Sequence, residues 1–168
     1  KWIRKTKKMS KNSPKSKVLL LSKYFIFKNK EEKLGLSNKK LQKLLYYAQA
    51  WSLVLNDKPI FDDKIEAWVH GPAIPLVYFT FKDFGFKDIN IKFNIKELDS
   101  ITEEDKKILD EVWRVYGKFD APYLEALSHN ETPWQEARKG LLPHEISGNE
   151  ISTESMQQYY GQKIQRTS

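Results

Sequence analysis

The sequence predicts a single, mostly helical α+β domain with a small antiparallel β-sheet. Most apolar residues recur at spacings of three and four, which is typical of helices with one buried side. Two stretches, 61–69 and 89–93, largely alternate apolar and polar residues, which is typical of strands. At 168 residues with 40% hydrophobic residues, the chain is long enough for one core.

The net charge of +7 is concentrated at one end of the chain. Residues 1–17 contain eight Lys or Arg and no acid, which leaves 21 of the 29 basic residues against 22 acids, a charge of −1. We therefore expect residues 1–16 to form a basic, flexible tail and residues 17–168 to form the domain. A nearly neutral domain does not favour nucleic-acid binding except through the tail.

Seven helices are expected from apolar spacing, proline starts and capping residues. The expected helices run from Pro14 to about Phe27, with the polar run Asn29–Lys33 breaking the helix; from the cap Ser37 to Leu55; from Pro75 to about Phe84; from the cap Thr102 to Tyr116; onward from the cap Asp120; from Thr132 to Gly140; and onward from the cap Ser152.

The second of these helices is apolar nearly all round. Leu41, Leu44 and Leu45 belong to a stripe at helical spacing, but Tyr46 lies on another side of the helix. Such a helix is central, or it faces a partner as well as the core. Lys43 and Tyr46 lie away from the stripe and are therefore surface candidates, although Tyr46 also fits a buried aromatic whose hydroxyl is paired.

The two strands are expected to pair with each other. The first, 61–69, ends sharply at Gly71-Pro72, and the second is Ile89–Phe93. A small antiparallel sheet results.

Residue patterns that carry catalysis are missing from the sequence. There is no cysteine, and the three histidines, His70, His129 and His144, have no metal-ligand spacing among them. No glycine-rich phosphate loop occurs, and Ser128-His129, as neighbours on a helix, point in different directions. We predict no catalytic residue, metal or cofactor, and hence a protein that is not an enzyme.

No run of 18 apolar residues and no apolar stretch behind the basic start occurs, so neither a membrane span nor an export signal is predicted. Together with the lack of cysteine, this favours a cytoplasmic protein.

Three motifs in order resemble one family. They are Leu41-Gln42-Lys43-Leu44-Leu45-Tyr46-Tyr47-Ala48-Gln49, the block Pro59–Pro72 with Ala67-Trp68 running into Gly71-Pro72, and Leu127-Ser128-His129 followed by Pro133-Trp134. Together they resemble the Panacea (SocA-like, phage-associated) antitoxin domain. The departures are His70 and Ala73-Ile74, which differ from the usual residues around Gly-Pro.

The resemblance implies a type II-like antitoxin that binds and neutralises a cognate protein toxin. Two alternatives stay open: a proteolytic adaptor that delivers a toxin to a cytoplasmic protease, and a DNA-binding regulator.

The residues expected to bind the partner come from the three motifs. For Trp68 an interface anchor competes with a core residue packed on the central helix. His70 and His129 also fit hydrogen bonds to backbone near the Gly-Pro turn, Gly71 and Pro72 fit a purely structural turn, and Trp134 fits a seal over the core. The candidates are Lys43, Tyr46, Trp68, His70, Gly71, Pro72, His129 and Trp134.

Overall fold

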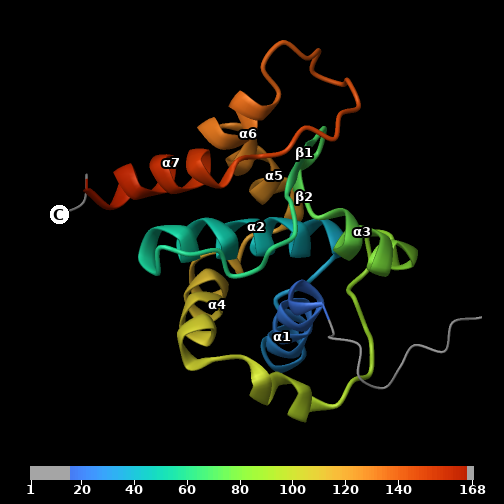
Figure 1. The fold of residues 1–168 in the computed structure, drawn as a ribbon. Coiled ribbons are helices and arrows are strands. Elements are labelled where there is room, and N and C mark those ends of the chain that lie inside the picture. Colours follow the sequence, from blue (N-terminus) through green and yellow to red (C-terminus); the bar gives the residue numbers. More distant parts are fainter. Residues whose placement is uncertain (1–15, 166–168) are drawn as a thin grey trace, which may run out of the picture.

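The computed structural model describes residues 16–165 and is built around one central helix, α2 (Figure 1). In the view of Figure 1, α1 and α4 lie below α2, and the hairpin of β1 and β2, with α5, α6 and α7, lies above it. The elements are α1 (Lys17–Glu32), α2 (Asn38–Leu55), β1 (Glu66–Trp68), β2 (Gly71–Ala73), α3 (Pro75–Phe81), the 3₁₀ helices η1 (Lys82–Phe84) and η2 (Ile95–Ser100), α4 (Glu103–Tyr116), α5 (Ala121–His129), α6 (Thr132–Ala137) and α7 (Thr153–Gln165). The predicted class, a mostly helical α+β fold with a small antiparallel sheet, is confirmed.

Helix α2 is central because it is apolar on every side. Ser37 caps it as predicted, its hydroxyl accepting a hydrogen bond from the Lys40 amide at 3.2 Å. Leu41, Leu44 and Tyr46 have no exposed surface, although they point in different directions around the helix. Neighbours therefore surround α2 from its first turn almost to its last.

The first helix differs from the prediction at both ends. The predicted start at Pro14 and the predicted basic tail, Ser16 apart, lie outside the described residues; within them α1 begins at Lys17. The predicted break at Asn29–Lys33 is wrong, because the helix continues to Glu32. There Lys33 takes a left-handed conformation (φ 54°), and the Asn29 side chain accepts the Gly35 amide at 2.8 Å. The polar run is thus the last turn and its cap.

The sheet is a hairpin in which Trp68 pairs with Gly71 and Glu66 with Ala73. The prediction that 61–69 is one strand ended by Gly71-Pro72 is wrong in two ways. Only Glu66–Trp68 is strand, and Gly71 and Pro72 belong to its partner strand.

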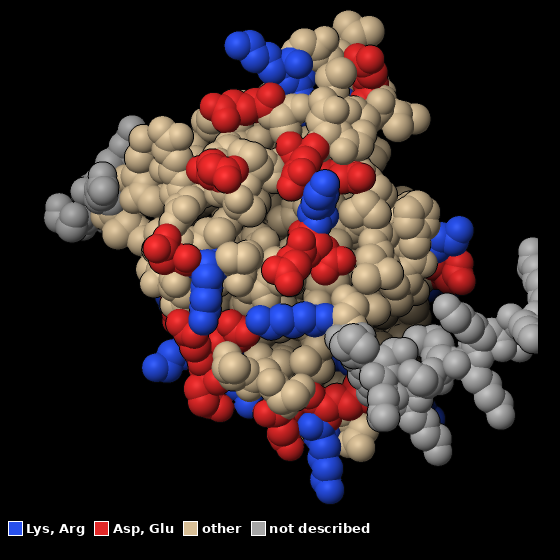
Figure 2. All heavy atoms as spheres, viewed as in Figure 1, with Lys and Arg blue, Asp and Glu red and all other residues tan. Residues whose placement is uncertain are grey.

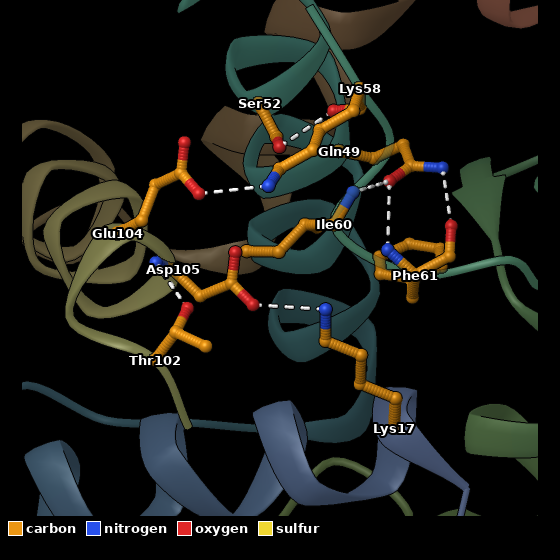
Figure 3. Close-up of polar contacts among 9 residues, drawn as sticks. All are labelled: Lys17, Gln49, Ser52, Lys58, Ile60, Phe61, Thr102, Glu104 and Asp105. Carbon is orange, nitrogen blue, oxygen red and sulfur yellow. Dashed lines mark hydrogen bonds and ion pairs between the residues drawn. The ribbon is translucent and has the colours of Figure 1, made fainter. Parts of the chain in front are cut away.

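A side chain of α2 replaces strand pairing just before β1. Gln49 accepts the Ile60 amide at 2.9 Å and donates to the Phe61 carbonyl at 2.9 Å (Figure 3). Because these backbone groups are already bonded, the segment needs no neighbouring strand. The same loop is tied on by Ser52, which donates to the Lys58 carbonyl at 2.8 Å (Figure 3).

The predicted strand Ile89–Phe93 is also wrong. Its alternation reports burial correctly, since Ile89 is buried while Asn90 and Lys92 are exposed. However, its backbone bonds to α1 and to the segment that follows α1. The Ile91 carbonyl accepts from Lys30 of α1 at 2.6 Å, and the Ile89 amide donates to the Leu36 carbonyl at 2.9 Å. An extended segment packed on a helix alternates as a strand does, so the pattern alone could not identify its partner.

The later helices start as predicted. Thr102, Asp120 and Ser152 each accept a backbone amide three residues further on. Helix α6 ends at Ala137, before the predicted Gly140. Among the helices within residues 16–165, none has the length and apolar character needed to cross a bilayer.

Candidate partner-binding site

Seven of the eight predicted binding residues meet at one junction, where the hairpin lies on α2, α5 and α6. We call it the hairpin junction. Its members from the prediction are Lys43, Trp68, His70, Gly71, Pro72, His129 and Trp134.

At the base of this junction lies Lys43. The prediction that Lys43 lies at the surface is wrong: the residue is 2% exposed, and its Nζ donates to the Pro72 carbonyl at 3.1 Å. Burial, with a smaller contribution from Lys39, lowers the pKa of Lys43 to about 7. The charged end of a lysine usually indicates a surface residue, but here the hairpin backbone lies against that end and the side chain is buried.

Gly71 and Pro72 are buried on top of Lys43. A Cβ at Gly71 would lie 2.5 Å from Lys43 Cε and 3.1 Å from Ser128 Oγ. Gly71 also has φ +105°, a conformation that side chains rarely adopt. The backbone conformation therefore favours glycine, and a larger residue would also displace the buried end of Lys43.

His70, in the hairpin turn, is the most exposed of the seven, with a side chain 76% accessible. Its Nδ1 lies 2.9 Å from Glu125 Oε1, and the same carboxylate oxygen accepts from Lys39 at 3.0 Å. Burial raises the pKa of Glu125, but the bonds from Lys39 and His70 outweigh it, and the net shift is downward. The prediction that His70 bonds backbone is wrong, since its partner is this side chain.

His129 and Trp134 hold the hairpin from the other side. The His129 ring stacks on Trp134 with centroids 4.0 Å apart, and its buried Nε2 has no hydrogen-bond partner among the described residues, so the backbone bond of His129 stays a prediction. Burial lowers the pKa of His129, and the Lys43 charge adds to this, although Glu125 opposes it. Trp134 Nε1 donates to the Trp68 carbonyl at 2.9 Å.

Trp68 belongs to an exposed aromatic cluster that the sequence reasoning missed. Its ring meets Tyr78 edge-on at 5.0 Å and Phe79 at 6.5 Å between centroids. Tyr78 is 37% and Phe79 60% exposed, while Trp68 is half-buried. We call Trp68, Tyr78 and Phe79 the aromatic face. The sequence contained a signal for this face. Val77 and Phe81 are four residues apart and so share one side of a short helix, which leaves Tyr78 and Phe79 on other sides.

Tyr46 lies elsewhere, and the prediction that it lies at the surface is wrong. It is fully buried, with its hydroxyl 3.0 Å from that of Tyr160 on α7. Tyr47 and Tyr160 donate to Glu131 Oε1 at 2.5 and 3.0 Å, and Lys163 donates to Oε2 at 3.1 Å. We call this network the α7 junction; it fits the alternative of a buried tyrosine with a paired hydroxyl.

An apolar groove of about 250 Å³ lies between α2, α4 and the end of α7. It is lined by Trp51, Leu55, Ile108, Glu111, Val112, Val115, Tyr116 and Ile164. Within residues 16–165 there is no cluster of three or more His, Asp or Glu that fits a metal ion.

Charges are mixed on the face shown in Figure 2. Carboxylates are spread over it, and lysines stand among them without merging into a continuous basic surface. This view agrees with the near-neutral charge of the domain and offers no track for a phosphate backbone.

Comparison with known proteins places the chain in a family. Residues 41–135 match the family described as "Antitoxin SocA-like, Panacea domain". The chain belongs to this family. The matched range runs from α2 to the middle of α6 and contains the whole hairpin junction and the aromatic face, whereas α1 and α7 lie outside it.

One curated relative is Antitoxin SocA of Caulobacter vibrioides (strain NA1000 / CB15N), 34% identical over 117 residues. The alignment covers 64% of this chain and 62% of the relative, so the chain spans less than two thirds of that protein. No solved structure matches.

Proposed function

We propose that this Panacea-domain protein is an antitoxin that neutralises a cognate protein toxin by direct complex formation, with no bond made or broken on its own surface. The aromatic face is the observation that carries the proposal. Trp and Tyr at rigid positions supply much of the energy of protein interfaces. The face lies in the part of the chain that matches the family, and the name of the relative, Antitoxin SocA, supports the role.

The hairpin junction makes the aromatic face rigid before binding. Trp68 is held by Trp134 through its carbonyl, and its own Nε1 donates to Glu66 Oε2 at 2.6 Å. A preorganised surface loses little conformational entropy when a partner binds. His70, at the adjacent turn, would lie at the rim of the interface.

The test is co-expression with the product of the gene next to this chain's own, scored by growth and by co-purification. Phe79→Ser is expected to abolish rescue, because it removes the most exposed aromatic ring of the face, while changing the free energy of unfolding by only about 0.5 kcal/mol. Ile95→Ser is the matched control, since Ile95 is 58% exposed but lies on η2. Rescue by the Phe79 variant equal to that by the Ile95 variant would place the toxin elsewhere.

A proteolytic adaptor is the second candidate, because the groove between α2, α4 and α7 offers a second apolar surface made from other helices. An adaptor must hold a client and a protease at once. If this role is correct, toxin levels in cells fall only when the protease is present. A stable toxin–antitoxin complex with unchanged toxin levels supports neutralisation alone.

A further inference from the structure

Lys43 is the buried cation of the hairpin junction, and its bond goes to backbone. Its Nζ donates to the Pro72 carbonyl of β2. The nearest carboxylate of the junction, Glu125, is bonded to Lys39 and His70. A buried cation that bonds a single carbonyl adds little net stability, because the desolvation it costs is large. The position that Lys43 gives the hairpin is therefore more informative about its role than the stability it contributes.

The contact with Gly71 fixes the height of the hairpin above α2. Lys43 Cε lies 2.5 Å from the position that a Cβ of residue 71 would take, so the β2 backbone lies close against the end of the lysine side chain. Ser128 Oγ lies 3.1 Å from the same position, from α5. We call this contact of Gly71 with Lys43 and Ser128 the seat of the hairpin.

The seat supports Trp68 from the side of β2. In the hairpin register Trp68 pairs with Gly71, while Trp134 holds the Trp68 carbonyl from α6. Trp68 in turn contacts Tyr78 and Phe79. Strand β1 is held independently, since Arg138 Nη1 donates to the Ala67 carbonyl at 2.8 Å. Lys43 is the corresponding support of β2.

We propose that Lys43 is a positioning residue for partner binding, which seats Gly71-Pro72 on α2 and thereby holds Trp68 in the aromatic face. This inference rests on the proposed function for its biological meaning, but the seating itself can be measured without a toxin.

The first experiment is hydrogen exchange at one fixed pH on Lys43→Met in the full chain. Methionine keeps the length and apolar stem of lysine and removes the donor. Losing the bond to the Pro72 carbonyl is expected to speed exchange of the 66–73 amides about three- to tenfold relative to amides elsewhere in the domain, which report any overall stability gained by removing the buried charge. Lys40→Met is the matched control: Lys40 is another buried lysine of α2, but its Nζ donates to the Gly117 carbonyl at 2.5 Å. It is expected to leave the hairpin amides unchanged.

Gly71→Ala tests the same seat from the opposite side. It is expected to raise exchange in the hairpin as Lys43→Met does. Gly140→Ala is its control, because Gly140 also has positive φ (+84°) but has nothing within 4 Å of an added Cβ. Unchanged hairpin exchange in both junction variants would overturn the positioning role.

The growth assay with the neighbouring gene separates this inference from the proposed function. Loss of rescue in Lys43→Met, with the folded fraction unchanged and Lys40→Met still active, supports positioning. If Phe79→Ser abolishes rescue while Lys43→Met with a loosened hairpin does not, positioning is wrong and the aromatic face stands. If neither variant affects rescue, the aromatic face itself is not the toxin site.

Discussion

The hairpin junction and the α7 junction lie on the same helix but are built on opposite principles. At the hairpin junction α2 contributes one buried cation, Lys43, that bonds a backbone carbonyl. At the α7 junction it contributes two tyrosines, whose hydroxyls join a carboxylate and a lysine in a closed side-chain network. The first junction supports an exposed aromatic face, and the second is sealed.

The two junctions also respond to pH in opposite ways. Burial raises the pKa of Tyr46, Tyr47 and Tyr160 well above the usual tyrosine range, so these three hydroxyls keep their protons throughout the physiological range. Burial lowers the pKa of Lys43 to about 7. Of the two junctions, the hairpin junction is therefore the one that contains a buried lysine, Lys43, that titrates near neutral pH. The α7 junction therefore keeps its tyrosine hydroxyls unchanged near neutral pH, whereas the hairpin junction contains a buried lysine that titrates there.

Breaking the α7 junction should have the largest effect. Glu131→Ala leaves the buried hydroxyls of Tyr47 and Tyr160 without their shared acceptor and should lower the free energy of unfolding by about 4 kcal/mol. Urea denaturation measures this. Glu154→Ala, an exposed glutamate in the first turn of α7, is the control and should cost about 0.5 kcal/mol. Equal losses in the two variants would mean that the network contributes nothing beyond surface charge.

Filling the seat of the hairpin junction comes next. Gly71→Ala should cost about 3 kcal/mol, because positive φ costs roughly 1 kcal/mol and pushing the buried end of Lys43 off the Pro72 carbonyl adds about 2 kcal/mol. Gly140→Ala carries only the first of these costs. The difference between the urea midpoints of the two variants measures the cost of the contact with Lys43. No difference would mean that the hairpin moves away from α2 without cost and that Lys43 does not fix its position.

The pH dependence of stability should give the smallest of the three effects. The pKa of Lys43 is 10.5 in the unfolded chain and about 7 in the folded one. Between these values the unfolded chain binds the extra proton, so raising the pH favours folding. Lys43 should add about 2 kcal/mol to the free energy of unfolding between pH 7 and pH 9. Urea titrations at several pH values measure the slope.

In Lys43→Met that contribution to the slope should be lost. The range stops at pH 9 because the buried tyrosines act in the opposite direction above their unfolded pKa of 10. A slope that persists unchanged in the methionine variant would assign the titration to another group.

The sequence was most informative where a local rule controls the structure. Ser37, Thr102 and Asp120 cap helices because a hydroxyl or carboxylate three residues before a free amide satisfies it whatever lies further away. The surroundings of α2 were predicted for a similar reason, since a helix without a polar side must be covered. Seven of the eight candidate residues also proved to be neighbours, although the three motifs that carry them are far apart in the sequence.

The errors share a cause as well. Gln49 bonds the backbone just before β1, and the Leu36 carbonyl accepts the Ile89 amide of segment 89–93. Both alternating stretches were predicted to be strands, but each is bonded to a helix or to the segment beside it. Lys43 and Tyr46 were placed at the surface because they lie away from the apolar stripe of their helix, and the partners of their polar ends are not visible in the sequence. Those partners, Pro72 and Tyr160, lie 29 and 114 residues away.

By itself the sequence determined the helical class, the helix caps, the central position of α2 and the resemblance to the Panacea family. Only the tertiary structure decided which strands pair, which polar groups are buried and which aromatic rings remain exposed. The physical reason is range. Caps and periodicity act over three or four residues, whereas the partner of a buried polar group is chosen by packing between segments that the sequence does not order in space.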